Sequence, residues 1–366
     1  MRDRSRTLGM LLLAALVVAA CAQGPAGGTS STGAAPAPPE RAATDTVPGG
    51  AQTTDAALAP LPQKISVSYS SVSATWLPVW LARDQGLFAR NGLDVDVSYI
   101  ASGTTSLQSL IAGDLQFTLN SASEPASAYL GGAPTRIALA WNRVLLALFM
   151  VDPSITAPEQ LRGKAIGITR FGGQPHIGAR LALRKWGLNP DTDVQYLQLG
   201  GVPEILGGMQ TGAVVGGALS PPTNVVAQRL GYRSLGDISR MDIPYQASTM
   251  TSMQPYLEAN PEVARRMARA LMQGIKLSLD DETAARAAVA KYTQVDDPEM
   301  LDTTMEFYRR TVEKIPYPSL EGIQTILDDL AESEPRARSV QPRELINTTA
   351  LEQLEREGFM TQLWGQ

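Results

Sequence analysis

The stretch over residues 66–105 constrains the fold most strongly, because its pattern alternates between strand and helix. Hydrophobic and polar residues alternate over 65–69 and again over 95–99, which predicts two strands. An apolar-faced helical pattern over 76–90 separates them and stops at an Asn-Gly pair. Such a β-α-β-α unit is typical of a doubly wound sheet, which binds ligands beyond the carboxyl ends of its strands. We therefore expect a site where the polar turns after these strands meet.

The same pattern begins again after residue 164. A strand is predicted over 165–169, a polar glycine turn follows it, and a helix is predicted over 177–186. Further strands are predicted over 194–199 and 213–215. Two successive series of this kind predict an α/β fold with two doubly wound lobes.

A later strand-like segment decides how the chain divides between the lobes. Residues 245–253 read as a strand that returns to the first series, and the chain after residue 280 reads as packing helices. We therefore predict lobe 1 from residues 64–150 plus 245–366, and lobe 2 from residues 151–244.

The amino-terminal segment has the pattern of a targeting signal. In residues 1–20, three arginines precede an apolar run that is too short to span a membrane. The run ends in Val-Ala-Ala-Cys and resembles a bacterial lipobox, in which Cys21 is lipidated and becomes the first mature residue. The alternative is a secretory signal with an incidental cysteine. Residues 21–63, rich in Gly, Ala, Ser, Thr and Pro, predict a disordered tether from a lipid anchor on the extracytoplasmic side of the cell membrane.

Composition excludes several classes of function. The net charge is −5 and no basic run occurs, which argues against binding to nucleic acid. One histidine and one cysteine among 366 residues leave almost nothing for a metal site or a histidine-dependent catalytic centre. We expect no metal, no cofactor and no catalytic residue.

Several short segments spread over residues 64–358 carry a resemblance to one family. They are residues 77–88, 91–95, 102–103, 107, 110–115, 117, 161–164, 167 and 351–359. In these segments the chain resembles a periplasmic-type solute-binding protein of an ABC importer. The most similar branch takes up nitrate, aliphatic sulfonates, taurine and thiamine pyrimidine precursors.

The resemblance implies a periplasmic binding protein-like fold of type II, with two lobes that close on a ligand in the cleft between them. It also implies a non-catalytic monomer that passes a small molecule to an ABC permease and its ATPase. Helix amino ends aimed into the cleft would offer free N–H groups to an anion or a polar carbonyl without any lysine or arginine. The same polar and aromatic surroundings suit a neutral heteroaromatic compound, so the ligand stays open.

The candidate ligand-binding residues follow the predicted strands of both lobes or lie at their ends. They are Thr75, Trp76, Ser102, Gly103, Thr104, Asn120, Ser121, Trp141, Asn142, Arg170, Gly172 and Gly173. His176, the lone histidine, is interpreted as a solvated or capping residue.

Two other classes of function stay open at this point. One is a ligand-sensing ectodomain that hands its state to a membrane receptor. The other is a pyrimidine-precursor synthase-like enzyme of the same fold, but such enzymes carry a cysteine-rich motif and catalytic histidines. Here Cys21 falls at the predicted lipidation site and only His176 remains.

Overall fold

The computed structural model describes residues 57–365. The predicted signal peptide (1–20), the lipidation site Cys21 and the rest of the tether up to residue 56 lie outside the described residues. The folded part begins before residue 64, where the sequence placed its boundary. The Leu58 N–H donates to the Arg90 carbonyl at 2.9 Å, and the Leu61 N–H donates to the Gly92 carbonyl at 2.8 Å.

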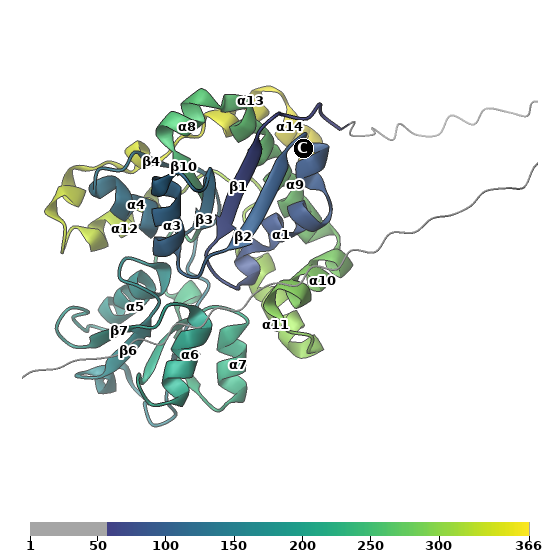
Figure 1. Cartoon of the computed structure of the whole chain (residues 1–366). Coiled ribbons are helices and arrows are strands. Elements are labelled where there is room, and N and C mark those ends of the chain that lie inside the picture. The colour runs from purple at the N-terminus through teal and green to yellow at the C-terminus, as the bar shows by residue number, and fades with distance from the viewer. Residues whose placement is uncertain (1–56, 366) are drawn as a thin grey trace, which may run out of the picture. The chain divides into compact units, whose positions relative to one another are not determined.

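The first sheet has the strand order β2-β1-β3-β10-β4 (Figure 1). Strand β1 (Lys64–Tyr69) pairs in parallel with β2 (Asp94–Tyr99) and with β3 (Phe117–Asn120). Strand β10 (Ser248–Met253) pairs antiparallel with β3 and with β4 (Thr135–Asn142). A strand from late in the chain therefore separates β4 from the strands that precede it. We call this sheet and the helices that pack on it lobe 1.

The second sheet has the order β7-β6-β8-β5-β9. Strand β6 (Ala165–Ile168) pairs in parallel with β7 (Gln195–Gln198) and with β8 (Gly216–Leu219). Strand β5 (Leu148–Val151) pairs antiparallel with β8 and with β9 (Arg233–Asp237). We call this sheet, with α5, α6 and α7, lobe 2. Two lobes of this kind confirm the predicted α/β fold class.

Helices follow most of the strands and fill the carboxyl-terminal part of the chain (Figure 1). No helix within residues 57–365 is both long enough and apolar enough to cross a membrane. The helices are α1 (Leu77–Asp84), α2 (Leu87–Arg90), α3 (Gly103–Ala112), α4 (Ser123–Leu130), α5 (Gln174–Lys185), α6 (Val202–Gln210), α7 (Thr223–Arg229), α8 (Gln254–Ala259), α9 (Pro261–Asp280), α10 (Glu282–Thr293), α11 (Pro298–Thr311), α12 (Leu320–Leu330), α13 (Thr349–Arg356) and α14 (Phe359–Trp364).

The largest apolar cluster lies under α1 and α9 in lobe 1. Trp80 of α1 and Leu271 of α9 are fully buried in it. A side chain of this size stabilises the fold by about 1.5–3 kcal/mol when it is fully buried. Gly274 faces the Pro78 carbonyl so closely that any side-chain carbon there would collide with it. The two helices therefore pack at backbone distance, and only glycine fits at residue 274.

A second apolar cluster joins the two lobes. It contains buried residues of α4 from lobe 1 and of α5 from lobe 2, together with residues of α12. Beside it, the buried Arg180 of α5 donates through Nε to both carboxylate oxygens of Asp329 on α12, at 3.1 and 3.2 Å. Arg184 also pairs with Asp329. Apolar packing and a buried ion pair thus hold α5 against α12 at the same place.

Two details differ from the expectations drawn from the sequence. Strand β5 pairs only within the second sheet, so residues 148–150 belong with lobe 2 and not with lobe 1. The strand predicted at 213–215 lies at 216–219 instead, and β9 was not predicted.

Candidate ligand-binding cleft

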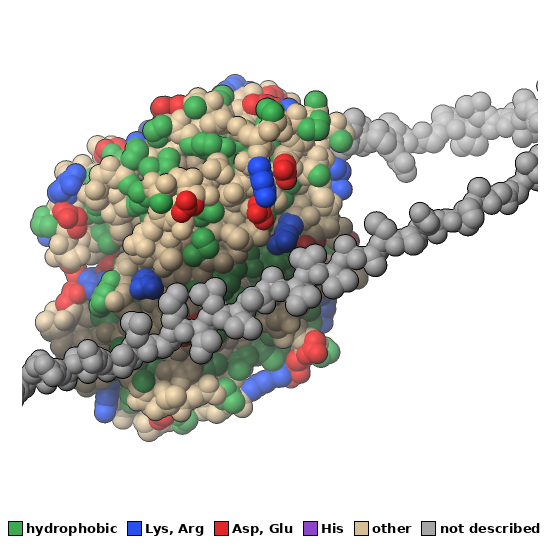
Figure 2. Space-filling view, viewed as in Figure 1, with side chains coloured by type: hydrophobic (Ala, Val, Ile, Leu, Met, Phe, Trp, Pro, Cys, Tyr) green, Lys and Arg blue, Asp and Glu red, His purple; other side chains and the backbone are tan. Residues whose placement is uncertain are grey.

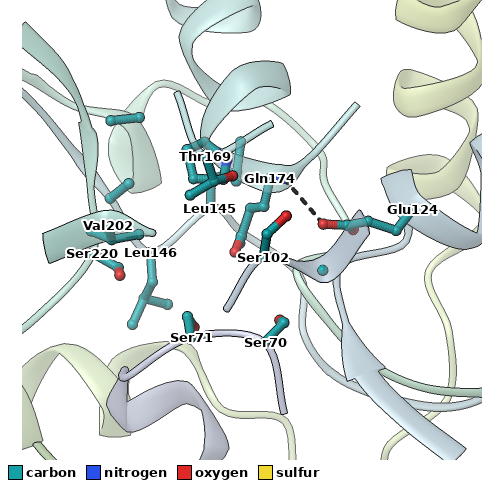
Figure 3. A pocket seen from close by; sticks show the side chains of 14 residues that line it. Ser70, Ser71, Ser102, Glu124, Leu145, Leu146, Thr169, Gln174, Val202 and Ser220 are labelled. Atoms are coloured by element: carbon teal, nitrogen blue, oxygen red, sulfur yellow. Dashed lines mark hydrogen bonds between the residues drawn. The ribbon is translucent and has the colours of Figure 1, made fainter. Parts of the chain in front are cut away.

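A pocket lies between the two lobes, at the edge where the carboxyl ends of the parallel strands meet (Figure 3). The pocket is narrow in this arrangement of the lobes: the cavity itself has a volume of about 30 Å³, within about 490 Å³ of space that includes the open solvent at its mouth. In the space-filling view a hollow runs between the lobes, and hydrophobic side chains gather on its visible wall (Figure 2). The lining residues are Ser70, Ser71, Ser102, Gly103, Glu124, Leu145, Leu146, Ala147, Thr169, Gln174, Pro175, Val202, Ala218 and Ser220.

The polar lining residues come from segments that follow strands in both lobes. In lobe 1, Ser70 follows β1, Ser102 follows β2, and Glu124 lies at the start of the helix after β3. In lobe 2, Thr169 follows β6 and Ser220 follows β8. This is the edge that a doubly wound sheet offers to a ligand. A small molecule in the pocket would therefore contact both lobes at once.

The apolar part of the wall comes largely from the chain segment that crosses between the lobes. Leu145, Leu146 and Ala147 lie between β4 and β5 and are all buried. Val202, at the start of α6, faces the pocket near them (Figure 3). The pocket therefore combines hydroxyl groups with an apolar wall, as is typical of small-molecule sites.

Ser102 is strained and has an unsatisfied hydroxyl. Its φ of 74° and ψ of 125° lie where residues other than glycine are rare. The residue is 3% exposed, and its Oγ has no hydrogen-bond partner within the described part of the chain. Its N–H donates to the Ser70 carbonyl at 3.1 Å, which fixes the turn before α3. Backbone strain and an unsatisfied buried hydroxyl are both costly, and such features cluster at ligand sites.

Glu124 is the ionisable residue of the lining set. Its Oε1 accepts from the Gln174 N–H at 3.3 Å, which links α4 in lobe 1 to the amino end of α5 in lobe 2 (Figure 3). Its Oε2 accepts from the Ser123 hydroxyl at 3.0 Å. Burial raises the pKa of Glu124 to about 7, although these donors oppose the rise. A carboxyl group that is half ionised near neutral pH thus sits between the lobes.

Some of the residues predicted from the sequence lie at or beside this pocket. Ser102 and Gly103 line it. Thr104 and Gly172 line an adjoining groove that shares Glu124 with the pocket. Gly173 is buried at the start of α5, and a side-chain carbon there would lie 3.7 Å from the Thr104 hydroxyl. These residues bring the two predicted turns, one from each lobe, to the same place.

The other predicted residues are not among the lining residues. Arg170 is exposed on its loop. Asn120 and Ser121 are buried, and they bond to Thr249 and Tyr245 respectively. The remaining four, Thr75, Trp76, Trp141 and Asn142, form a buried group in lobe 1.

That buried group reaches the pocket through Trp76. The rings of Trp76 and Trp141 lie edge to face with centroids 5.8 Å apart, and the Trp141 indole N–H donates to the Thr75 carbonyl at 2.9 Å. The Thr75 hydroxyl donates to Asn142 at 3.0 Å. The Trp76 indole N–H donates to the hydroxyl of Ser71, which lines the pocket, at 2.9 Å. Trp76 therefore positions a lining residue.

Sequence reasoning missed several lining residues. Glu124 looked like an ordinary acidic residue in the first turn of a helix, where it favours the helix dipole. Ser70 and Gln174 stood in the polar turns that the sequence marked, and Thr169 stood at the end of a predicted strand, but nothing in the sequence tells which side chains there face inward. The available signal was position, because each of the three lies at the end of a predicted strand or in the turn that follows one.

His176 holds the loop before α5. The Gly172 N–H donates to its Nδ1 at 3.1 Å, and its ring lies edge-on to those of Phe171 and Tyr196. Burial, and then the charge of Arg180, lowers the pKa of His176 to about 4. The ring is therefore neutral at pH 7 and accepts this bond. Within residues 57–365, no cluster of His, Cys, Asp and Glu side chains is placed to hold a metal ion.

Comparison with known proteins agrees with this architecture. The model of the NMT1-like family matches residues 62–293. A putative binding protein of Bacillus subtilis (strain 168), YtlA, is 25% identical over 286 residues, which are 74% of this chain and 84% of YtlA. The nitrate/nitrite binding protein NrtA of Nostoc sp. is 31% identical over 126 residues, which are 33% of this chain and 28% of NrtA.

Solved structures show the same fold at low sequence identity. The alkanesulfonate-binding protein SsuA from Xanthomonas axonopodis pv. citri, bound to MOPS, has a TM-score of 0.65 at 18% identity. The match covers 81% of this chain and 98% of SsuA. The nitrate-binding protein NrtA from Synechocystis PCC 6803 has a TM-score of 0.67 at 12% identity. The match covers 84% of this chain and 90% of NrtA. The chain thus belongs to the NMT1-like family and has the two-lobed fold of periplasmic binding proteins such as SsuA and NrtA.

Proposed function

We propose that this protein is an extracytoplasmic solute-binding lipoprotein that captures a small molecule between its lobes and delivers it to an ABC importer. The single observation that carries the proposal is the pocket at the strand ends, where the unsatisfied Ser102 hydroxyl lies between walls from both lobes. A ligand that contacts both lobes favours their closed arrangement through its differential affinity. The proposal assigns no catalytic residue.

The relatives support a solute-binding role in general terms. YtlA is described as a putative binding protein, and NrtA and SsuA are named for nitrate or nitrite and for alkanesulfonates. Transfer to a permease and an ATPase is the role that this kind of protein has in an ABC importer. The lipid anchor and the monomeric state belong to the proposal as well.

Removing the Ser102 hydroxyl is expected to weaken solute binding without unfolding the protein. In Ser102→Gly the strain at positive φ disappears together with the hydroxyl, so the melting temperature without solute should stay the same or rise. Affinity should fall about tenfold, the usual effect of losing one hydrogen bond of 1–1.5 kcal/mol. The measurement is a thermal-shift screen followed by calorimetry on the solutes that bind. A solute at about a hundred times its Kd should stabilise the wild type by about 2.7 kcal/mol.

Ser333→Gly serves as the matched control, because this serine lies in an exposed turn after α12, away from the pocket. The affinity of the Ser333→Gly variant for the solute should equal that of the wild type. A Ser102→Gly variant that binds as tightly as the wild type would contradict the assignment of the pocket.

Replacing Cys21 by serine should release the protein from the membrane pellet, because serine cannot form the thioether that carries the lipid. The measurement is fractionation of cells that express each form, with labelled palmitate as the second readout. Cys21→Ser protein that stays in the pellet, or wild-type protein that takes up no label, would leave the lipoprotein part of the proposal without support. The solute-binding part would not be affected.

A sensing ectodomain is the second candidate, since a closed lobe pair can signal to a receptor as well as load a permease. The genes beside this one separate the two roles. A permease gene with an ATPase gene supports import, and a sensor kinase gene without them supports sensing.

A further inference from the structure

The carboxylate of Glu124 occupies the place where helix amino ends from the two lobes converge. It accepts the Gln174 N–H at the start of α5. It also lies so close to Gly103, at the start of α3, that any side chain on that residue would collide with it. Helix amino ends of this kind are the usual receptors for anions in proteins. Here the protein's own carboxylate already fills that position.

We propose that the solute presents an N–H donor group, neutral or cationic, to Glu124, and that the same carboxylate excludes anions such as nitrate and sulfonates. This inference rests on the proposed solute-binding function and names the chemical class of solute for that site.

The carboxylate has acceptor capacity left for a ligand. An ionised carboxylate accepts about four hydrogen bonds. Within residues 57–365 the Ser123 hydroxyl and the Gln174 N–H donate to the Glu124 carboxylate, at 3.0 and 3.3 Å, and the backbone N–H groups of Glu124 and Ser121 lie close enough to lower its pKa. An amino, amidine or ammonium group can fill the remaining positions. The Ser102 hydroxyl, which has no partner within those residues, can accept or donate beside it.

The charge balance of the pocket points the same way. Within residues 57–365, no lysine or arginine lines it, and Arg170 on the neighbouring loop is exposed. An anion in the pocket would therefore meet a buried carboxylate of like charge with no cation to compensate. A cation or a neutral hydrogen-bond donor would instead stabilise the ionised carboxylate. Burial disfavours that ionised form and therefore raises the pKa of Glu124.

The rest of the wall limits what the donor group is attached to. Leu145, Leu146 and Val202 offer an apolar surface, whereas Ser70, Ser71 and Ser220 offer hydroxyl groups. An apolar or ring-shaped body with a nitrogen donor at one end satisfies both kinds of wall. Amines, amidines and amino-substituted heterocycles share this chemistry.

The test sorts possible solutes by charge before any is identified. A small-molecule extract of cells is separated by ion exchange into cationic, neutral and anionic fractions, and each is tested for raising the melting temperature of the purified protein. Nitrate and ethanesulfonate are tested directly beside them. We expect the cationic or the neutral fraction to raise the melting temperature, and the anionic fraction and both pure anions to have no effect.

The Glu124→Gln variant then tests the residue itself. With the active fraction as probe, its affinity should fall about tenfold or more, because hydrogen bonds to a charged acceptor are the stronger kind. Glu321→Gln, an exposed acid in the first turn of α12, is the matched control and should bind as the wild type does. As a measurement that needs no variant, titration in buffers of different ionisation enthalpy should show proton release when a cationic solute binds near pH 7.

The outcomes separate the two proposals. A melting-temperature rise with the anionic fraction or with either pure anion overturns the charge inference alone. Unchanged affinity in Glu124→Gln also overturns that inference alone. No rise with any fraction overturns the solute-binding function, and this inference with it.

Discussion

Replacing Asp329 by asparagine should lower the free energy of unfolding by about 2–4 kcal/mol, because the change leaves Arg180 buried with less compensation. The side chains are 1% and 7% exposed, so water cannot replace the lost partner. Asp191 and Glu332 also pair with Arg180, and both are about half exposed. Because these partners remain in the variant, we expect a smaller loss of unfolding free energy than for an isolated buried pair. The measurement is urea unfolding at pH 7.

Asp96→Asn is the control for this change, because Asp96 pairs with Lys64 on the surface, where both side chains are more than half exposed. That substitution should cost under about 1 kcal/mol. Equal losses in the two variants would show that the buried pair contributes no more than a surface pair. The double variant Arg180→Met with Asp329→Leu should recover much of the stability, since an apolar pair of similar volume can replace a buried ion pair.

The Glu124→Gln variant should gain stability over the wild type as the pH rises from 5 to 8, by about 2–3 kcal/mol across that interval. Burial raises the pKa of Glu124 in the folded state to about 7, from an ordinary value of 4.5. The folded protein therefore holds this proton more tightly than the unfolded chain. Its contribution to stability is fully present below pH 4.5 and is lost as the pH rises through 7. Glutamine does not ionise in this pH range, so the stability of the variant does not fall as Glu124 would lose its proton.

His176 acts in the opposite direction and has to be separated from this effect. Its pKa falls to about 4 in the folded state from 6.5, so its contribution is present above pH 6.5 and is lost as the pH falls through 4. Because both proteins contain His176, the difference between their unfolding free energies at each pH cancels it. Burial, and then the charge of Glu124, raises the pKa of Tyr245, so Tyr245 stays neutral across the interval. A difference that does not change between pH 5 and pH 8 would refute the assigned ionisation of Glu124.

The sequence predicted the elements whose side chains alternate clearly. The strands expected at 65–69, 95–99 and 165–169 are present as β1, β2 and β6. Strand β8 was misplaced because Gly-Gly-Ala-Leu has little strand propensity. Those glycines are a requirement of packing: side-chain carbons at Gly216 and Gly217 would collide with the carbonyls of Met150 and Gly167 on the neighbouring strands. Such a requirement is visible only once the strands are paired.

The location of the candidate site was also predictable, because the carboxyl ends of parallel strands meet at one edge. The inward-facing residues were not. Polar turns mark the edge, but the direction of a side chain depends on what packs behind it. Trp76 and Trp141 point into the core because their rings pack edge to face against each other there. Glu124 reaches the pocket because Gly103, far from it in the sequence, leaves room for the carboxylate.

The position of β10 between β3 and β4 affects the order in which the two lobes can fold during synthesis, when the chain leaves the ribosome with its amino end first. The second sheet has all its strands once Asp237 has emerged. The first sheet cannot join β4 to β3 until Met253 follows, although four of its five strands are made earlier. Long-range pairing of this kind is slow and leaves strand edges open in the meantime. A nascent chain released before residue 253 would therefore contain a finished second lobe and an incomplete first one, which is prone to aggregate.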